Sequence, residues 1–183
     1  MKLLVEVKDL ERPLPKKEAS RAAYALLSRL LSENRLPSSP ILRDENGRPY
    51  IPAPSPRRFD FNLSHAGRYI AVAIAIAENE SEPVRVGIDV EIPHENIRRE
   101  RLADRFFSEN EIERLKKCGY EEKEFLRIWT KKEAYLKFIG TGLSGGMKEA
   151  DTERADALRV TLSEYETDGN AVVAVCTDAH SVR

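Results

Sequence analysis

The segment GIDVE, residues 87–91, places Asp89 and Glu91 two positions apart. If this segment forms a β-strand, both carboxylates point to one face of the sheet, and Gly87 leaves space beside them. Neighbouring carboxylates repel each other, and a cation relieves that repulsion. Oxygen ligands of this kind suit Mg²⁺, which also takes water and phosphate oxygens. The spacing is therefore consistent with a magnesium site, and equally with the solvated polar face of an edge strand.

A second cluster lies on the predicted amphipathic helix WTKKEAYLK. Glu133 follows Trp129 by one turn, and Lys137 follows Glu133 by one turn on the same side. We expect Glu133 to join the two carboxylates of GIDVE around the metal, while Lys132 and Lys137 neutralise phosphate charge. An exposed Glu–Lys pair would have the same spacing and would contribute only about 0.3–0.5 kcal/mol.

The third candidate is the pair Ser64–His65 in FNLSHAG, which we predict to lie in a turn at SHAGR, residues 64–68. Adjacent residues of a strand face opposite ways, which is poor geometry for a Ser–His nucleophile pair. A hydroxyl, an imidazole and turn amides can instead bind a phosphate. A solvated histidine is the alternative.

The sequence GTGLSG, residues 140–145, matches the dinucleotide fingerprint G-x-G-x-x-G. That fingerprint needs a strand before it and a helix after it, so that the pyrophosphate meets a helix N-terminus. Here it follows a long helix. Gly140 and Gly142 are therefore interpreted as the C-terminal stop of that helix.

Composition narrows the function classes. The 183 residues are 41% apolar and 33% charged, with a net charge of -1. This balance argues against a dedicated nucleic-acid binder. The start, MKLLVEVKDLERP, is too short and too charged for a signal peptide or a membrane span. The two cysteines have no metal or redox spacing, so we expect reduced thiols in a cytoplasmic protein.

The remaining pattern predicts an α+β protein with two similar halves, residues 1–83 and 84–183. Residues 37–56 hold six prolines and are expected to form a loop. The expected elements are strands at residues 2–7, 59–63, 69–77, 84–92, 158–162 and 171–176, the last two joined by a turn at Asp168–Gly169, with a helix from Lys16, a helical region from about Asn96 and the helix that contains Trp129. Each half then has the order strand, helix, strand, strand.

Five segments in this order, NGRPYIP, FNLSHAG, GIDVE, RFFSENE and WTKKEAYLKFIGTGL, resemble the 4'-phosphopantetheinyl transferases, and more closely the surfactin-synthetase-activating type. The resemblance spans about residues 16–145. It implies a pseudo-dimer of two α+β halves in one monomeric chain. It also implies Mg²⁺-dependent transfer of the 4'-phosphopantetheine arm of coenzyme A to a serine of an apo carrier protein, releasing adenosine 3',5'-bisphosphate. The carrier would serve fatty-acid, polyketide or peptide synthesis.

The resemblance also assigns residues. Those implied at the site are Asp89, Glu91 and Glu133 for the metal, Glu133 and Lys137 for catalysis, and Gly47, Arg48, Pro49, Ser64, His65, Lys132, Lys137 and Arg21 for coenzyme A. Larger members carry a longer N-terminal region whose lysines bind the 3'-phosphate. Here either Lys16 and Lys17 take over that task or the 3'-phosphate is held more loosely.

Two other functions remain open from the residues. A different Mg²⁺-dependent phosphate enzyme, such as a nucleotide hydrolase, would use the same carboxylates without a protein acceptor. A catalytically silent carrier-binding protein would not need the intact set of three carboxylates. The segment NIRRERLADRFF adds Arg98, Arg99, Arg101 and Arg105, which either steer an acidic carrier or form a solvated helix face with the interleaved glutamates.

Overall fold

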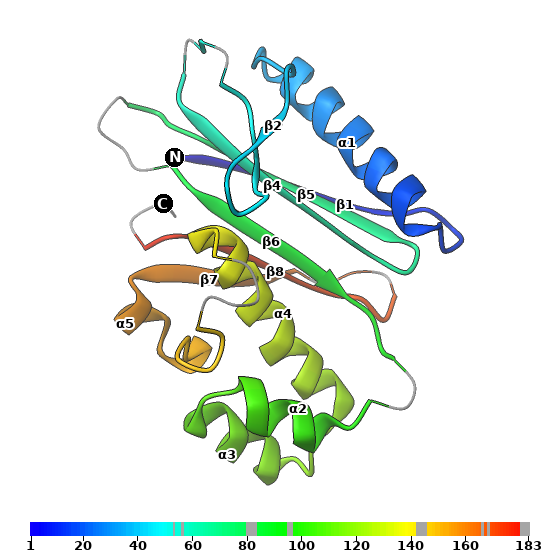
Figure 1. Cartoon of the computed structure of the whole chain (residues 1–183), viewed down its shortest axis with the longest axis vertical. Helices are drawn as coiled ribbons and strands as arrows, with labels where there is room; N and C mark the ends of the chain where they lie inside the picture. The colour runs from blue at the N-terminus through cyan, green and yellow to red at the C-terminus, as the bar shows by residue number, and fades with distance from the viewer. Residues whose placement is uncertain are drawn as a thin grey trace.

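The computed structural model describes residues 1–52, 54–55, 57–79, 84–94, 97–141, 146–165, 167 and 169–179. Two antiparallel three-stranded sheets form its centre (Figure 1). The first has the order β1-β5-β4, from β1 (Lys2–Asp9), β5 (Tyr69–Ile76) and β4 (Phe59–Ala66). The second has the order β6-β8-β7, from β6 (Val86–Glu91), β8 (Val172–Asp178) and β7 (Val160–Tyr165). In both sheets the first strand of the half pairs with the last one.

One long helix covers the outer face of each sheet. Helix α1 (Lys16–Glu33) packs its leucines against β4 and β5, where Leu27, Leu31, Phe61 and Ile74 are fully buried. Helix α4 (Glu122–Ile139) packs against β6 and β8 on the other side of the molecule (Figure 1). The layers therefore run α1, first sheet, second sheet, α4, and an α+β fold is confirmed.

The inner faces of the two sheets pack against each other. Strand β5 contributes Ala71, Ala73 and Ala75 to this interface, and β6 contributes Val86, Ile88 and Val90. The outer residues of β5 are valine and isoleucine, which face α1. The alternation in YIAVAIAI thus directs small alanine side chains toward the second sheet and larger valine and isoleucine side chains toward α1.

Side chains join the edge of the first sheet to the edge of the second. Alternate residues of β4 reach β6: Asp60 Oδ2 accepts from the Val86 N–H at 2.8 Å, and Asn62 Oδ1 accepts from the Ile88 N–H at 3.4 Å. Ser64, the next residue on that face, bonds to the side chain of Asp89. These bonds bring Ser64 and Asp89 together.

The remaining elements are smaller. They are the hairpin of β2 (Leu42–Arg43) and β3 (Pro49–Tyr50), helices α2 (Arg99–Phe106), α3 (Glu109–Lys117) and α5 (Ala155–Leu158), and the 3-10 turn η1 (Thr152–Arg154). The hairpin lies inside the predicted proline-rich loop; it is two residues long on each side, which one proline at a strand end allows. No helix among the described residues is long and apolar enough to cross a bilayer.

The predicted strands and long helices are confirmed, with shifted ends. Strand β4 continues to Ala66, so the turn expected at 64–68 is shorter, and Ser64 and His65 lie on the strand. Gly140 ends α4 with a left-handed φ of 80°, which confirms it as a helix stop. Gly142 and Asp168, also predicted to lie at turns, are outside the described residues.

Candidate active site

The position of α4 on β6 depends on Gly87. A Cβ atom at this glycine would lie 2.0 Å from the Ala134 carbonyl oxygen and 2.5 Å from the Phe138 nitrogen. Contacts that short are not possible, so only glycine lets the helix backbone approach the strand this closely. The close approach brings Glu133 and Lys137 of the helix to the carboxylates of the strand.

Asp89 is the buried centre of the cluster, with 4% of its surface exposed. Its Oδ1 atom accepts from Ser64 Oγ at 2.8 Å and from Lys137 Nζ at 2.7 Å. Lys137 Nζ also donates to Ser64 Oγ at 2.8 Å. Asp89 Oδ2 is buried and has no hydrogen-bond partner in the described part of the chain. A buried carboxylate oxygen without a partner is costly, and it is a natural position for a cation or a ligand proton.

A hollow of about 290 Å³ opens beside Asp89. It is lined by Leu63, Ser64, His65, Asp89, Val90, Glu91, Glu133 and Lys137. Burial, and then the charge of Asp89, raises the pKa of Glu133 to about 7. The same two causes raise the pKa of Glu91, although His94 Nε2, 3.5 Å away, opposes part of the shift. The structure thus brings the three predicted carboxylates to one hollow.

These carboxylates suit a divalent cation by their charge and donor type, and not by a pre-formed geometry. Within the described residues no three His, Cys, Asp or Glu side chains form a ready metal-holding group. Lys137 instead supplies the positive charge next to Asp89. The unpartnered Asp89 Oδ2 and the raised pKa values of Glu91 and Glu133 still indicate excess negative charge, which a hard cation would relieve. The predicted magnesium set remains a prediction.

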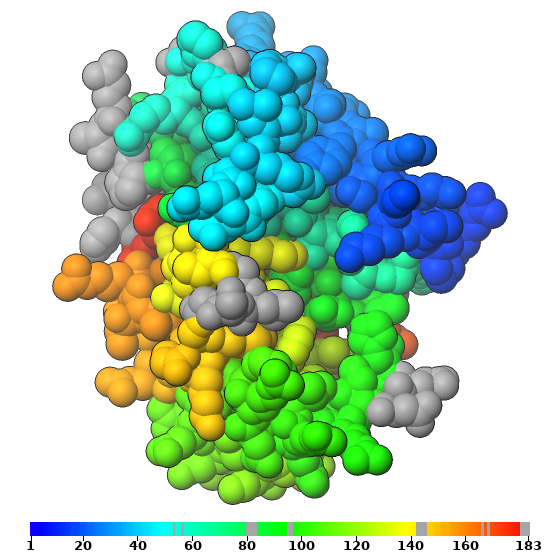
Figure 2. Space-filling view, in the orientation of Figure 1, coloured from blue at the N-terminus to red at the C-terminus, as the bar shows by residue number. Residues whose placement is uncertain are grey.

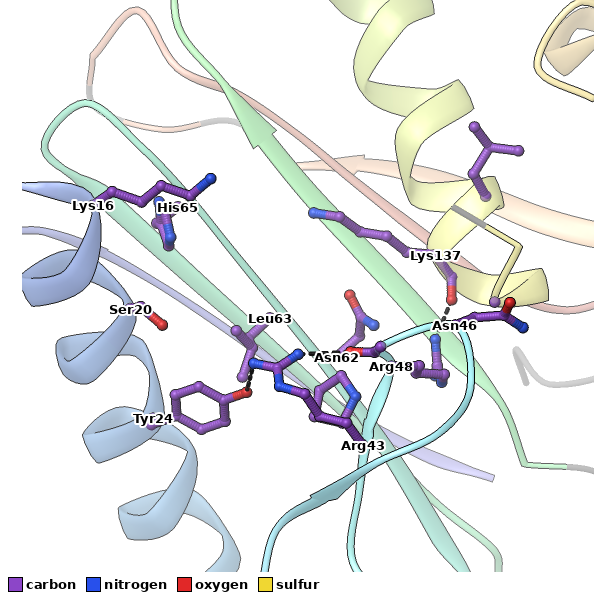
Figure 3. A pocket seen from close by; sticks show the side chains of 14 residues that line it. Lys16, Ser20, Tyr24, Arg43, Asn46, Arg48, Asn62, Leu63, His65 and Lys137 are labelled. Atoms are coloured by element: carbon purple, nitrogen blue, oxygen red, sulfur yellow. Dashed lines mark hydrogen bonds between the residues drawn. The ribbon is translucent and has the colours of Figure 1, made fainter. Parts of the chain in front are cut away.

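A second hollow, of about 350 Å³, lies between α1, the β2–β3 hairpin and β4 (Figure 3). It is lined by Lys16, Ser20, Tyr24, Arg43, Asn46, Gly47, Arg48, Pro49, Asn62, Leu63, His65, Leu136, Lys137 and Gly140. Leu63, His65 and Lys137 line both hollows. A molecule bound in the larger hollow could therefore reach the carboxylates past Lys137.

The wall of the larger hollow is pre-organised on the hairpin side. Arg43 donates to the Gly47 carbonyl oxygen at 2.6 Å and to the Tyr24 hydroxyl at 3.0 Å (Figure 3). Gly47 has a φ of 80°, and a side chain there would meet nothing within 4 Å. Opposite them, burial and the charge of Lys137 lower the pKa of His65. A neutral imidazole in this position can donate or accept a hydrogen bond.

Arg48 lines this hollow, but its guanidinium is engaged inside the protein. It donates to the carbonyl oxygens of Lys137 and Val86 and pairs with Asp60 Oδ2 at 2.5 Å, and only 9% of its side chain is exposed. The predicted contact of Arg48 with coenzyme A is thus left to its aliphatic part. Its charge holds the end of α4 to β4 and β6.

Lys132 is the clearest departure from the predicted site. Its side chain is fully buried on another face of α4, where Nζ donates to Glu111 Oε2 at 2.6 Å and to the Ala150 carbonyl oxygen at 2.5 Å. Consecutive helix residues point about 100° apart, so Lys132 faces away when Glu133 faces the hollow. The prediction that it neutralises phosphate charge is corrected by this geometry.

Arg21 remains a predicted coenzyme A residue that lines neither of the two hollows. It is exposed and does not line the larger hollow, whereas Lys16, Ser20 and Tyr24 of the same helix do. These three residues recur every four positions and mark the helix face that we missed. Sequence reasoning also missed Arg43 and Asn62, for which the sequence offered no distinct signal.

The family model described as "4'-phosphopantetheinyl transferase superfamily" matches residues 85–179. The 4'-phosphopantetheinyl transferase AcpT of Salmonella typhimurium is 34% identical over 160 residues, covering 85% of this chain and 74% of the relative. The 4'-phosphopantetheinyl transferase psf-1 of Bacillus pumilus is 31% identical over 147 residues, covering 72% and 58%.

A putative 4'-phosphopantetheinyl transferase of Synechocystis is 33% identical over 91 residues, covering 49% of this chain and 35% of the relative. The chain therefore spans less than two thirds of the Synechocystis and Bacillus relatives and about three quarters of AcpT.

Proposed function

Because the chain belongs to the 4'-phosphopantetheinyl transferase superfamily, we propose that it transfers the 4'-phosphopantetheine arm of coenzyme A to a serine of an apo carrier protein. The observation that carries this proposal is the pair of adjoining hollows that share Lys137 and His65. The larger hollow suits a nucleotide, and the smaller one gathers the groups that phosphoryl transfer needs. A pyrophosphate lying across Lys137 would connect them.

In the proposed reaction the serine hydroxyl oxygen attacks the β-phosphorus of coenzyme A in line. The bond from that phosphorus to the bridging oxygen of the pyrophosphate breaks, and adenosine 3',5'-bisphosphate leaves with this oxygen. When coenzyme A is bound, the ammonium group of Lys137 moves from Asp89 to the phosphate oxygens and neutralises charge on the leaving group. Positioning and charge neutralisation provide most of the rate in reactions of this class.

Glu133 is the proposed proton acceptor for the serine hydroxyl. Its pKa of about 7 is close to the value that suits a general base near neutral pH. A carboxylate that binds a metal tightly is not free to accept a proton, so we assign the metal chiefly to Asp89 and Glu91. When bound, Mg²⁺ would neutralise charge on the pyrophosphate oxygens.

Within the family we propose the surfactin-synthetase-activating type, built as a pseudo-dimer in a cytoplasmic monomer. The matching strand order of the two sheets, β1-β5-β4 and β6-β8-β7, supports two related halves. Lys16, which lines the larger hollow, is proposed to bind the 3'-phosphate, while Lys17 does not line it.

The acidic carrier is proposed to approach along α2. Arg98, Arg101 and Arg105 are exposed there, although Arg105 lies over the Phe106 ring, and Arg99 is held by the Tyr120 carbonyl oxygen. Reversing two of the exposed charges, Arg98→Glu with Arg101→Glu, should raise the KM for the carrier several-fold at low salt and flatten its salt dependence. The KM for coenzyme A should stay constant; equal losses for both substrates would rule out this surface.

The decisive experiment incubates the protein with coenzyme A, Mg²⁺ and an apo carrier protein and weighs the carrier by mass spectrometry. A gain of one phosphopantetheine arm, together with release of adenosine 3',5'-bisphosphate, supports the transferase. Cleavage of coenzyme A without a carrier would indicate a hydrolase. An unmodified panel of fatty-acid, polyketide and peptide carriers, with intact coenzyme A, would indicate a silent carrier-binding protein.

A further inference from the structure

A buried ion pair lies on the side of α4 that does not face the hollow. Glu111 of α3 and Lys132 of α4 are both fully buried, and their charged atoms are 2.6 Å apart. Lys132 Nζ also donates to the Ala150 carbonyl oxygen and lies 5.6 Å from the centre of the Phe107 ring. The described part of the chain has no other ion pair with both side chains completely buried.

Glu111 connects three segments through its two carboxylate oxygens. Oε2 accepts from Lys132 Nζ and from the Ser108 N–H, the latter at 2.8 Å as part of the capping box that begins α3. Oε1 accepts from the N–H and the hydroxyl of Thr152, at 2.9 and 2.6 Å. The pair therefore ties the start of α3, the middle of α4 and residues 150–152 to one point.

This node is placed to fix the rotation of α4 about its own axis. Lys132 and Ala134 are two residues apart, so they point about 200° apart around the helix. The backbone of Ala134 and Phe138 lies against Gly87 of β6, and the Ala134 side chain is buried with Ala174 and Cys176 of β8. Lys132 is bonded to Glu111 on the opposite side. Glu133 lies between these two contacts and faces the hollow, with Lys137 one turn further.

Stability alone is a poor explanation of such a pair. The cost of removing two charges from water roughly cancels their attraction, and well-packed apolar residues often serve as well. Apolar residues supply less direction, because a lysine bonded to both a carboxylate and a carbonyl oxygen restricts the rotation of the helix to orientations in which both bonds can form. The sequence neighbour Glu133 needs that orientation.

We infer that Lys132 and Glu111 are positioning residues, which hold α4 in the rotation that directs Glu133 and Lys137 at Asp89. The inference rests on the proposed transferase function. It adds to that function two residues that contact no substrate. It also gives Lys132 a role other than coenzyme A binding.

The test compares Lys132→Met alone with Lys132→Met combined with Glu111→Gln. The single variant leaves the Glu111 charge buried without its cation and should lower the Tm. The double variant removes both charges, while the glutamine can still accept from the Ser108 N–H, and should recover much of the Tm. Its kcat should nevertheless stay about ten- to a hundredfold low, since small misplacements of reacting groups have effects of this size.

Two further measurements and one control variant separate positioning from stability. All are carried out at a temperature well below the Tm of each variant. The affinity for coenzyme A, measured by calorimetry, should change less than threefold, because most of the larger hollow is built from the N-terminal half. The acid limb of the pH–rate profile should shift, since Glu133 has moved. The control is Lys131→Met on the same helix, which breaks a partly exposed 2.6 Å ion pair between Lys131 and Glu164 of β7. It should leave kcat unchanged.

A double variant whose kcat and pH profile return with its Tm would overturn the inference. If Lys132→Met does not fold, Thr152→Val removes one bond to Glu111 and should lower kcat in the same direction by a smaller factor; an unchanged kcat there would also overturn it. Wild-type protein that modifies no carrier would instead contradict the proposed function, so the two failures are distinct.

Discussion

Helices α1 and α4 are each 18 residues long, and each covers the outer face of a three-stranded sheet with the same strand order. They differ in how close they come to the sheet. Helix α1 stands on leucine side chains, with Leu27 and Leu31 fully buried against the isoleucines and valine of β5. Helix α4 touches the backbone of β6 at Gly87. The close contact, and not the shared architecture, brings acidic and basic groups together.

The difference extends to what the two helices bury. The described interior of α1 is apolar, whereas α4 buries Lys132 and Thr130 and presents Glu133 and Lys137 to a hollow. A helix held by polar bonds and backbone contact has one allowed rotation. A helix held by leucines alone tolerates repacking. The side of the molecule that contains α4 is therefore the side that we expect to carry the chemistry.

The largest effect is expected from Asp89→Ala, which removes the buried centre of the charged cluster beside α4. Transfer at saturating Mg²⁺ should fall at least about a thousandfold, at the upper end of losses seen when one preorganised charge is removed. Within the described residues the Asp89 side chain bonds only to the side chains of Ser64 and Lys137, so the circular dichroism spectrum should remain that of wild type. Near-normal turnover of Asp89→Ala would disprove the proposed metal and phosphate site.

Gly87→Ala tests the close approach directly. The added methyl group must push α4 off β6 and separate Lys137 from Asp89, so kcat should fall about ten- to a hundredfold. The free energy of unfolding should fall by about 1–3 kcal/mol, as overpacking usually does. Gly119→Ala is the matched control: its Cβ meets nothing within 4 Å, although its φ of 64° adds strain. It should lose stability and keep its kcat; equal kcat losses would contradict the comparison.

His65→Ala sharpens the comparison from the side of the first sheet. His65 lines both hollows, and the larger one, proposed to bind coenzyme A, lies on its α1 side, so the KM for coenzyme A should rise about tenfold while kcat falls less. Steady-state kinetics with varied coenzyme A measures both. A covalent intermediate on Ser64, or a kcat that titrates with His65, would restore a nucleophilic role to this pair.

The smallest expected effect is the pH dependence of the free energy of unfolding, measured in the absence of a divalent cation. The pKa of Glu133 is raised from 4.5 to about 7, so the folded protein holds this proton more tightly than the unfolded chain. Its contribution to stability is therefore fully present below about pH 4.5 and is lost as the pH rises through about 7. Thermal melts in a chelator between pH 5 and 8 should show this decline, and Glu133→Gln should flatten it. An equal decline in the variant would place the titration elsewhere.

Residues close in sequence carried most of what could be predicted. Alternation and helical spacing identified the strands and both long helices, because burial of one face is a local pattern. The D-x-E spacing placed Asp89 and Glu91 on one face of β6, and the i, i+4 spacing placed Glu133 and Lys137 on one face of α4. The sequence predicted free space at Gly87 beside the carboxylates. In the structure the backbone of α4 fills that space.

Only the tertiary structure decided which polar groups meet. Lys132 and Glu133 are neighbours in sequence, yet one is paired with Glu111 in the interior and the other lines the hollow, because a helix turns about 100° per residue. Arg48 was expected to be available to a ligand. Its guanidinium instead binds groups of β4, β6 and α4, namely Asp60 and the carbonyl oxygens of Val86 and Lys137. Sequence periodicity determines which face of an element is buried. The partner that covers this face is set by contacts between residues distant in the chain, and these fix the charge and reach of each side chain.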